Sequence, residues 1–511
     1  MPAAATPNVA FIRPELGAML PLYTLIRDCI AGDATIKKAG RRYLPQPNPT
    51  DTSEENQARY EAYLLRAVFY NVTGRTVDSL VSTVFAKSIE KDIPKELEQV
   101  EADATGESLS LSHLARKALA FAIAFSRYGV YVDYPMTDGA VTVAELPDMR
   151  PTIHLVAPQH IVNWRLLNIG SQVVLSKVVI AELWPFYDDG FEIKNACQFR
   201  VYDLVPDGLG GYKVKMSIWR EPQPNVWDGL NVPKRRSYKL AQGYEEIYPT
   251  DFNGNFLDRI PFSFGGSENN DSSIDVPLIY DIAALNISHY RNSADYEESC
   301  YMMGQPTLWA SGLTDTWLKE VLGGTIRLGS WGGVALPEGG QMGLVQAQAN
   351  TMPAEAMEIK EKQMLALGAK LVENKTVQRT ATEATQDEVP NNSILANISK
   401  NVSAVMEWAL KTAALFTSGN RDIKVIYRLS TDFDVGTFNE QRALIIKEYQ
   451  AGLITWGEMR TVLRKAGVAT EKDDIAKREI DAERAKELEQ FAAVAGDPND
   501  PNDDSGNSNN E

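Results

Sequence analysis

The stretch SIDVPLIYDIAALNISHYRNSADYEESCYMMGQPTLWASG, residues 273–312, decides the fold because it contains a long helical pattern with almost no breaker. Asp275 or the valine after it can cap the helix, and Pro277 suits its first turn. Gly304 and the proline two residues later end the pattern. At about 1.5 Å per residue, the predicted helix 276–304 spans roughly 40 Å.

This predicted helix has two apolar edges rather than one. Two apolar edges require neighbours on two sides. A helix inside a bundle of its own chain and a helix flanked by copies of itself in a ring both show this pattern, and the sequence leaves the two open. One edge comprises Leu278, Ile282, Leu285, His289 and Tyr296, and the other Ile279, Ala283, Ile287, Tyr290, Ala294 and Tyr301.

The composition is that of a large folded protein with an acidic balance. The chain has 511 residues, of which 44% are apolar and 23% charged, and its formal net charge is −17. This length predicts roughly two to four domains. Tight, nonspecific binding to duplex DNA needs a basic face, so we expect a chain that can meet DNA without gripping it. Acidity also keeps proteins soluble, which is its commoner role.

Cysteine usage and hydropathy indicate synthesis in a reducing cytoplasm. Cys29, Cys197 and Cys300 lie far apart, and their odd number argues against a disulfide framework. The N-terminus lacks the basic and apolar regions of a signal peptide. The longest apolar run, ALAFAIAF, is far shorter than the ~20 residues that cross a bilayer, so we expect a buried helix there and no membrane.

The first half of the chain predicts helices followed by strands. Residues 1–109 are largely helical, and a further helix covers about 110–126. The segments GVYVDYP, TIHLVAP and QVVLSKVVIAELW have the alternation or β-branched content of strands. CQFRVYDLVPDGLGGYKVKMSIWRE predicts a hairpin around PDGLGG. Residues 110–275 therefore form a predicted α+β domain with an antiparallel sheet, and we expect GGSENNDSSID to be a flexible linker out of it.

The second half predicts long helices around a small unit. Residues 305–350 are rich in glycine and too few to bury much core alone. Two capping boxes, Thr437 with Glu440 and Thr455 with Glu458, predict helix starts near the C-terminus. The expected segments after residue 350 are a helix at 351–373, a polar loop at 374–392, a helix and strand at 393–430, a helical region at 431–490 and a disordered acidic tail at 491–511.

The sequence contains no recognisable catalytic or cofactor motif. Its four histidines, His113, His154, His160 and His289, lie outside any metal-ligand spacing. There is no GxSxG motif, and the glycine-rich strings lack the features of phosphate or dinucleotide loops. We therefore expect a protein without cofactor that is not an enzyme. A catalytic pair of carboxylates is the alternative that sequence motifs leave open, because such pairs are assembled in space.

The order of these segments resembles the portal proteins of tailed bacteriophages, whose order is wing, stem helix, clip, stem helix, tunnel loop, long wing helix and crown. NISHYRNSADYEESCYMMGQPTLWASGL looks like the end of the first stem helix in one compact branch of that family. IVNWR, GVYVDYP and IPFSF look like wing strings from that branch, and YQAGLITWGEMRTVLRKAGV is similar to the common crown motif. The resemblance covers nearly the whole chain and rests on the order of its strings.

The resemblance implies an α+β portal fold with an α+β wing (1–275), long stem helices (276–304 and 351–373), a small α/β clip (305–350) and a helical crown (431–490). It also implies a homo-oligomeric ring of about twelve copies at one capsid vertex of the virion. Double-stranded DNA passes through the channel during packaging and ejection, without sequence specificity. The implied partners are the terminase large subunit, the major capsid protein and a head–tail adaptor, and synthesis is in the host cytoplasm.

The resemblance also assigns candidate site residues. Polar side chains between the two apolar edges of helix 276–304 are expected to face water in the channel. The tunnel loop, 374–392, would place residues near DNA, and we expect Lys375 and Arg379 to steady it. The remaining candidates are Thr376, Gln378 and Thr380 in that loop; Trp309, Trp317 and Trp331 as clip contacts; and Leu278, Ile282, Leu285, Tyr290, Tyr296, Met357, Met364 and Leu371 between subunits of the stem.

Two other interpretations remain. The chain could be another virion structural or connector protein, although connector rings are normally shorter. It could also be a cytosolic α+β enzyme with a helical C-terminal domain. For the candidate residues, ordinary solvent-exposed loop charge is the alternative for Lys375 and Arg379, and a small core of its own is the alternative for the tryptophans of 305–350.

Overall fold

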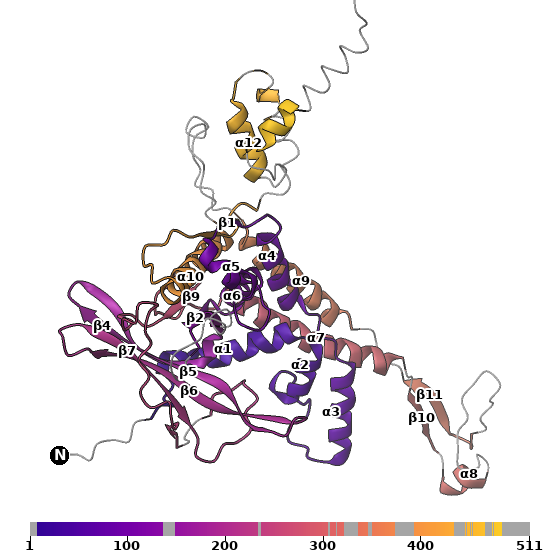
Figure 1. Cartoon of the computed structure of the whole chain (residues 1–511). Coiled ribbons are helices and arrows are strands. Elements are labelled where there is room, and N and C mark those ends of the chain that lie inside the picture. Colours follow the sequence, from indigo (N-terminus) through magenta and orange to yellow (C-terminus); the bar gives the residue numbers. More distant parts are fainter. Residues whose placement is uncertain are drawn as a thin grey trace, which may run out of the picture. The chain divides into compact units, whose positions relative to one another are not determined.

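The computed structural model (Figure 1) describes most of the chain, and it separates into two compact units, Met1–Thr431 and Asp432–Glu511, each described here by itself. Helices and strands both contribute to the first unit, which confirms the predicted α+β class. The described residues are 8–135, 149–233, 237–304, 307–312, 314–320, 336–345, 350–373, 393–433, 445, 447–449, 451, 453–465, 473 and 475–482.

The N-terminal part of the first unit is helical, and polar side chains cap several of its helices. The Ser53 side chain accepts a hydrogen bond from Asn56 N at 3.2 Å, and the Asn71 side chain accepts one from Gly74 N at 2.8 Å. The predicted helix near 110–126 is confirmed. These helices are α1 (Pro14–Ala31), α2 (Asp33–Ala39), α3 (Glu54–Arg66), α4 (Val72–Val84), α5 (Glu98–Ala102) and α6 (Leu111–Phe125).

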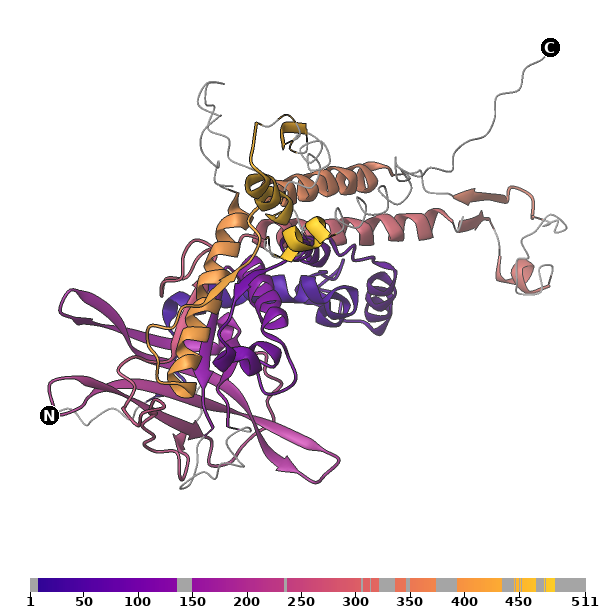
Figure 2. The ribbon, with the colours of Figure 1, turned by 45° about the horizontal axis from the view of Figure 1, so that its top comes forward.

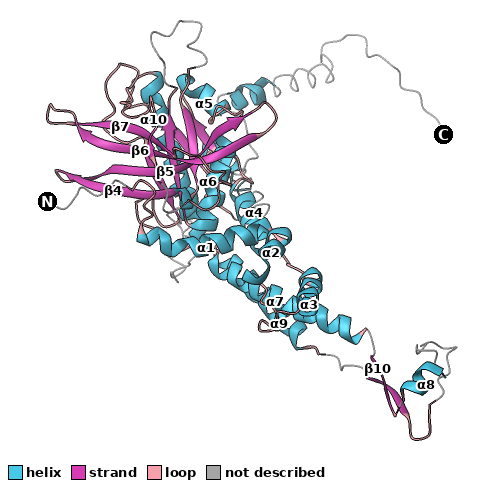
Figure 3. Cartoon of the chain, turned by 90° about the horizontal axis from the view of Figure 1, so that it is seen from below, coloured by secondary structure: helices cyan, strands magenta, loops and turns pink. Residues whose placement is uncertain are grey.

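Two antiparallel sheets follow, where the sequence predicts one (Figure 3). The three-stranded sheet has the order β3-β2-β9, and the five-stranded sheet the order β4-β5-β6-β7-β8. The predicted hairpin is confirmed as β6 and β7, whose turn is closed by backbone N–H groups donating to Asp207. The strands are β2 (Arg127–Asp133), β3 (Thr152–Val156), β4 (Ile161–Ile169), β5 (Gln172–Asp188), β6 (Ile193–Pro206), β7 (Tyr212–Arg220), β8 (Lys239–Leu240) and β9 (Phe262–Gly266).

The two faces of the five-stranded sheet differ in chemistry. One face carries a buried apolar cluster that includes Val162, Val179 and Phe199, one residue from each of three neighbouring strands. The opposite face is polar, because Arg200 on β6 forms ion pairs with Glu182 on β5 and with Asp133 on β2. The ion pair with Asp133 therefore connects the polar face to the three-stranded sheet.

The loop between β9 and the next helix is not the flexible linker that the sequence predicts. Asn397 and Asn401 donate side-chain hydrogen bonds to its carbonyl groups at 2.9–3.2 Å, and the buried Arg127 guanidinium donates to two more. The Asp275 carboxylate accepts from the backbone of Glu268 at 2.9 Å. Residues typical of loops thus form a fixed structure here, because other elements supply their hydrogen-bond partners.

A long helix, α7 (Tyr280–Met303), follows this loop and confirms the main prediction of the opening stretch. Its start differs from the prediction. Neither Asp275 nor the next residue caps it, because Asp275 is engaged with the preceding loop; the N-cap position is Ile279, without a side-chain bond. Pro277 lies one turn earlier, and its carbonyl accepts from Tyr280 N at 3.2 Å.

The chain then forms a small unit and returns along α7. β10 (Thr307–Ser311) pairs with β11 (Gln341–Val345), and α8 (Asp315–Glu320) lies between them in sequence. α9 (Met352–Lys370) runs antiparallel to α7 and packs along it (Figure 2). The path from one long helix through a small β unit to a second long helix is the order that the sequence predicts.

The third long helix, α10 (Ile394–Thr417), packs on α6, β2 and β9. Ser393 caps it by accepting from Ala396 N at 3.2 Å. After it, β12 (Ile426–Arg428) pairs with β1 (Glu90–Asp92) of the N-terminal part. One face of α10 is buried along its whole length, through Leu395, Ile398, Val402, Val405, Met406, Leu410, Ala413 and Phe416.

The second unit contains α12 (Trp456–Lys465). Its predicted capping box is confirmed: Thr455 N donates to Glu458 Oε2 at 2.7 Å, and Glu458 N donates to Thr455 Oγ1 at 3.3 Å. The other predicted capping box, at Thr437 and Glu440, lies outside the described residues, as does the predicted tail at 491–511.

Candidate functional site

The long helix α7 is held in place by polar side chains in its middle. Asn286 is fully buried; its Nδ2 donates to Tyr70 O at 2.8 Å, and its Oδ1 accepts from Thr73 N at 3.1 Å. Two helical turns later, Ser293 Oγ accepts from Val68 N at 3.0 Å and donates to Val68 O at 2.7 Å. These bonds tie α7 to the segment that connects α3 and α4.

This arrangement corrects the expectation that the polar side chains of α7 face a water-filled channel. Asn286 and Ser293 are buried, because α3, α4 and the segment between them cover that face of α7. Tyr63 of α3 likewise donates to Asp295 at 2.6 Å, and burial of the Tyr63 hydroxyl, together with this bond, raises its pKa. Asn286, Ser293 and Asp295 of α7 therefore contact the chain's own N-terminal part.

The predicted contacts between subunits need a similar correction. Four of the eight candidates are at most 8% exposed within a single chain. They are Ile282 and Tyr290 of α7, Met364 of α9, and Leu371, which directly follows α9. Their partners are α1, α3, α4 and the facing long helix, so they are not available to a neighbouring copy. The alternative of a bundle within one chain is correct for these four. The other four candidates, Leu278, Leu285, Tyr296 and Met357, are half-buried.

α7 and α9 are joined to each other by two neighbouring polar contacts near their middle. His289 Nε2 lies 3.0 Å from Glu361 Oε1, and Lys360 Nζ donates to Ser288 O at 3.1 Å. Burial, and secondarily the nearby charge of Arg291, lowers the pKa of Lys360. The pair of helices is therefore one packed element rather than two independent rods.

Five large apolar side chains remain exposed on this helix pair after the intrachain packing is complete. We call them the α7–α9 apolar set, and none was a predicted site residue. The set comprises Tyr301 (47% exposed), Met302 (54%), Met352 (74%), Ile359 (56%) and Leu365 (68%).

The small β unit carries one exposed aromatic side chain in its described part. Trp309 on β10 is 41% exposed and lies opposite Gly343 on β11. A Cβ at position 343 would come within 2.9 Å of the Trp309 indole nitrogen, so the glycine leaves room for the ring to cross the strand. Trp317 on α8 is half-buried, and Trp331 lies outside the described residues. Binding of a partner by these tryptophans stays a prediction.

The predicted DNA-channel residues all lie outside the described part of the chain, namely Lys375, Thr376, Gln378, Arg379 and Thr380. Among the residues that the structure does describe, no group of three or more His, Cys, Asp or Glu side chains could hold a metal ion. No helix within those ranges is long and apolar enough to cross a membrane.

Comparisons with known proteins give a match to a family of unknown function and distant likenesses to solved structures. Residues 277–417, from the turn before α7 to the end of α10, match a family described as a domain of unknown function (DUF4055). No curated protein matches the chain. A chain from a solved structure described as "Neck of empty GTA particle computed with C6 symmetry" is similar to it with 12% identity and a TM-score of 0.40, over 77% of this chain and 90% of that chain.

Proposed function

We propose that the protein is a structural, non-enzymatic component of a tailed-phage virion, and more specifically its portal protein. In this role, copies of the chain form a ring of about twelve at one capsid vertex. The proposal is supported by the sequence resemblance and by the path from α7 through the small β unit to α9.

The observation that carries the ring is the α7–α9 apolar set. Single exposed apolar residues are ordinary, but large ones gathered on one pair of packed helices are typical of an interface. Ile359 and Leu365 remain 56% and 68% exposed although α9 already packs on α7. A ring of identical copies would cover such a surface in every copy, because each subunit contacts the next in the same way.

The charge of the chain supports a passage for DNA rather than a DNA clamp. Each copy carries a formal net charge of −17, so a ring of copies repels a polyanion and leaves it free to slide. Lys375 and Arg379 would supply local positive charge along the passage. In this proposal the small β unit binds the terminase large subunit during packaging and the head–tail adaptor afterwards, and the rest of the ring meets the major capsid protein.

Light scattering coupled to size-exclusion chromatography tests the ring. We expect the full chain to form a particle near twelve times the 56.6 kDa chain mass, with a central hole in axial electron micrographs. Leu365→Glu should reduce it to monomers, because the interface would bury an unpaired carboxylate. Leu209→Glu is the matched control, since Leu209 is 93% exposed on the β6–β7 turn.

Two results would contradict the proposal. One is a wild-type chain that stays monomeric or dimeric at every concentration. The other is a ring that Leu365→Glu leaves intact, which would show that α9 does not lie between copies.

A further inference from the structure

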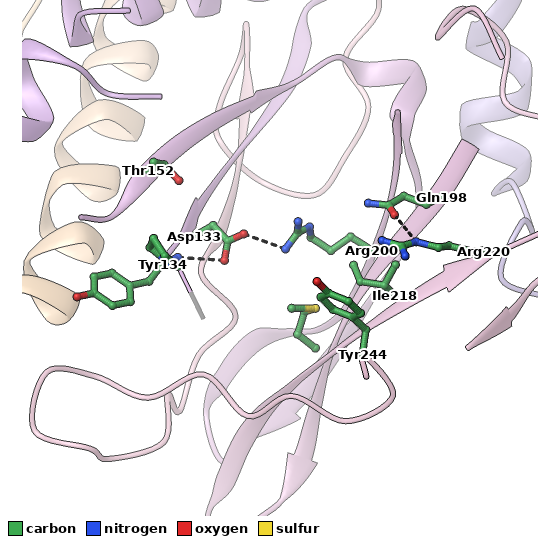
Figure 4. A pocket seen from close by; sticks show the side chains of 10 residues that line it. Asp133, Tyr134, Thr152, Gln198, Arg200, Ile218, Arg220 and Tyr244 are labelled. Atoms are coloured by element: carbon green, nitrogen blue, oxygen red, sulfur yellow. Dashed lines mark hydrogen bonds and ion pairs between the residues drawn. The ribbon is translucent and has the colours of Figure 1, made fainter. Parts of the chain in front are cut away.

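A pocket of about 380 Å³ opens on the polar face of the five-stranded sheet, beside the end of β2 (Figure 4). Arg200, Gln198, Ile218 and Arg220 lie on one side of it, and Tyr134 and Thr152 on the other. Its volume falls at the lower end of the range of small-molecule sites, about 300–1,000 Å³. None of the assembly surfaces described above includes this pocket.

The hydrogen-bonding groups on this face are already paired, with two exceptions. Gln198 Nε2 donates to Glu182 at 3.2 Å, and Arg200 donates to Glu182 at 2.8 Å and to Asp133 at 2.9 Å. The second oxygen of Asp133 accepts from Tyr134 N at 3.0 Å. The positive charge of Arg200 is thus offset by two carboxylates, and the acceptors of the lining are in use.

Arg220 is the exception that carries charge. Its Nε donates to Gln198 Oε1 at 2.9 Å, and its guanidinium carbon lies 4.2 Å from the Trp184 ring centre and 5.4 Å from that of Tyr244. These are its contacts within the described residues, and none is with a carboxylate. Burial lowers the pKa of Arg220, whereas nearby acidic groups, Glu182 first among them, hold the pKa of Arg200 well above its usual value despite burial.

The second exception is the Tyr244 hydroxyl, which forms no hydrogen bond with the described residues and belongs to a side chain that is 37% exposed. Both open polar groups of the pocket, the terminal nitrogens of Arg220 and this hydroxyl, can therefore donate hydrogen bonds. Ile218 and Met216, both at most 5% exposed, add an apolar floor, and the Trp184 and Tyr244 rings flank the guanidinium.

We propose that this pocket binds a carboxylate attached to an apolar or aromatic body, with Arg220 as the residue that holds the anion. The guanidinium presents a planar pair of N–H donors that matches a carboxylate, and the single uncompensated charge suits a monoanion. The carboxylate belongs either to a free small molecule or to an acidic side chain of a polypeptide. The proposal does not depend on the ring.

Saturation-transfer NMR with the full chain separates these sources. The probes are benzoate, its neutral relative benzamide, and the peptides Ac-GGEGG-NH2 and Ac-GGQGG-NH2. We expect benzoate or the glutamate peptide to bind, and the neutral partner of each pair to bind at least about tenfold more weakly. Binding of benzoate alone identifies a small-molecule site, whereas binding of the glutamate peptide identifies a polypeptide site.

Variants then assign the anion to this pocket. Arg220→Gln should weaken binding about tenfold or more, and Tyr244→Phe, which removes one donor and keeps the ring, should weaken it a few-fold. Arg165→Gln, at an exposed arginine on β4 of the same sheet, is the matched control and should change nothing. Absence of binding by both acidic probes, equal binding of the neutral ones, or full binding to Arg220→Gln would overturn the proposal.

Discussion

The replacement Asn286→Ala tests whether α7 is fixed by the N-terminal helices of its own chain. Asn286 Oδ1 accepts from Thr73 N, a first-turn donor of α4 that has no partner within its own helix. The N-cap residue Asn71 satisfies the neighbouring donor of Gly74, so the α4 cap is divided between Asn71 and a residue of α7. Removal of the Asn286 side chain leaves the fully buried Thr73 N–H without this partner.

The cost follows from the bonds that are lost. An unsatisfied buried donor costs about 1–3 kcal/mol, and the lost bonds to Tyr70 O and from Thr73 Oγ1 cost about 0.5–1.5 kcal/mol each. Tyr70 O keeps Val72 N as a partner at 2.8 Å, so it is not left unsatisfied. Alanine favours a helix by a few tenths of a kcal/mol relative to asparagine. We therefore expect a loss of at least about 2 kcal/mol in the free energy of opening this contact.

Hydrogen exchange of the Thr73 amide measures this loss directly. A loss of about 2 kcal/mol corresponds to roughly 30-fold faster exchange of amides in the first turn of α4. The control is Asn292→Ala on the same helix, because Asn292 is half-buried and makes no hydrogen bond with the described residues. If exchange at Thr73 is the same in both variants, the Asn286 bonds do not hold α7 to α4.

Four other predictions follow from the structure and the proposed function. Burial raises the pKa of the Cys29 thiol from 9.0 to about 12. At pH 8, maleimide should therefore label Cys300 and leave Cys29 unlabelled until urea unfolds the chain. Mass spectrometry of the labelled protein measures this difference. As the pH rises, the Cys29 thiol ionises in the unfolded chain before it ionises in the folded chain. The stabilising contribution of the protonated Cys29 to the free energy of unfolding is therefore complete below pH 9 and declines from pH 9 to about pH 12. Urea titrations across that pH range would detect this decline. Asn401→Ala removes donors to the loop after β9, and limited proteolysis should cleave this loop several-fold faster, whereas unchanged cleavage would show that the bonds do not fix it. Charge reversal at both Lys375 and Arg379 should impair DNA packaging or retention while the ring assembles normally, and unchanged packaging would contradict their role.

Local sequence patterns predicted the helices, strands and turns of this fold better than they predicted which of these elements pack against one another. The hairpin of β6 and β7, the helix α10 and the capping box at Thr455 could be predicted because spacing and turn residues encode them within a few positions. The loop after β9 could not, because its fixed structure depends on Arg127 and Asn401, which are distant in sequence.

The same limit explains the error on α7. Its two apolar edges correctly indicated neighbours on two sides, but periodicity cannot distinguish helices of the same chain from copies of it. Ile282 and Tyr290 are covered by helices more than 200 positions earlier in the sequence, and nothing within 276–304 specifies them. The pocket was missed for a related reason: Arg220 and Tyr244 belong to different segments, and a backbone hydrogen bond from Ile218 N to Tyr244 O brings the second segment beside β7.

The fixed loop after β9 has a mechanical consequence. It lies directly before α7, and its carbonyl groups are held by Arg127 of β2 and by Asn397 and Asn401 of α10. A force applied to the far end of α7 would therefore act on β2 and on α10 through these hydrogen bonds, and would not simply extend a flexible linker. A pull on the β10–β11 end would therefore be transmitted through α7 to the three-stranded sheet and to α10.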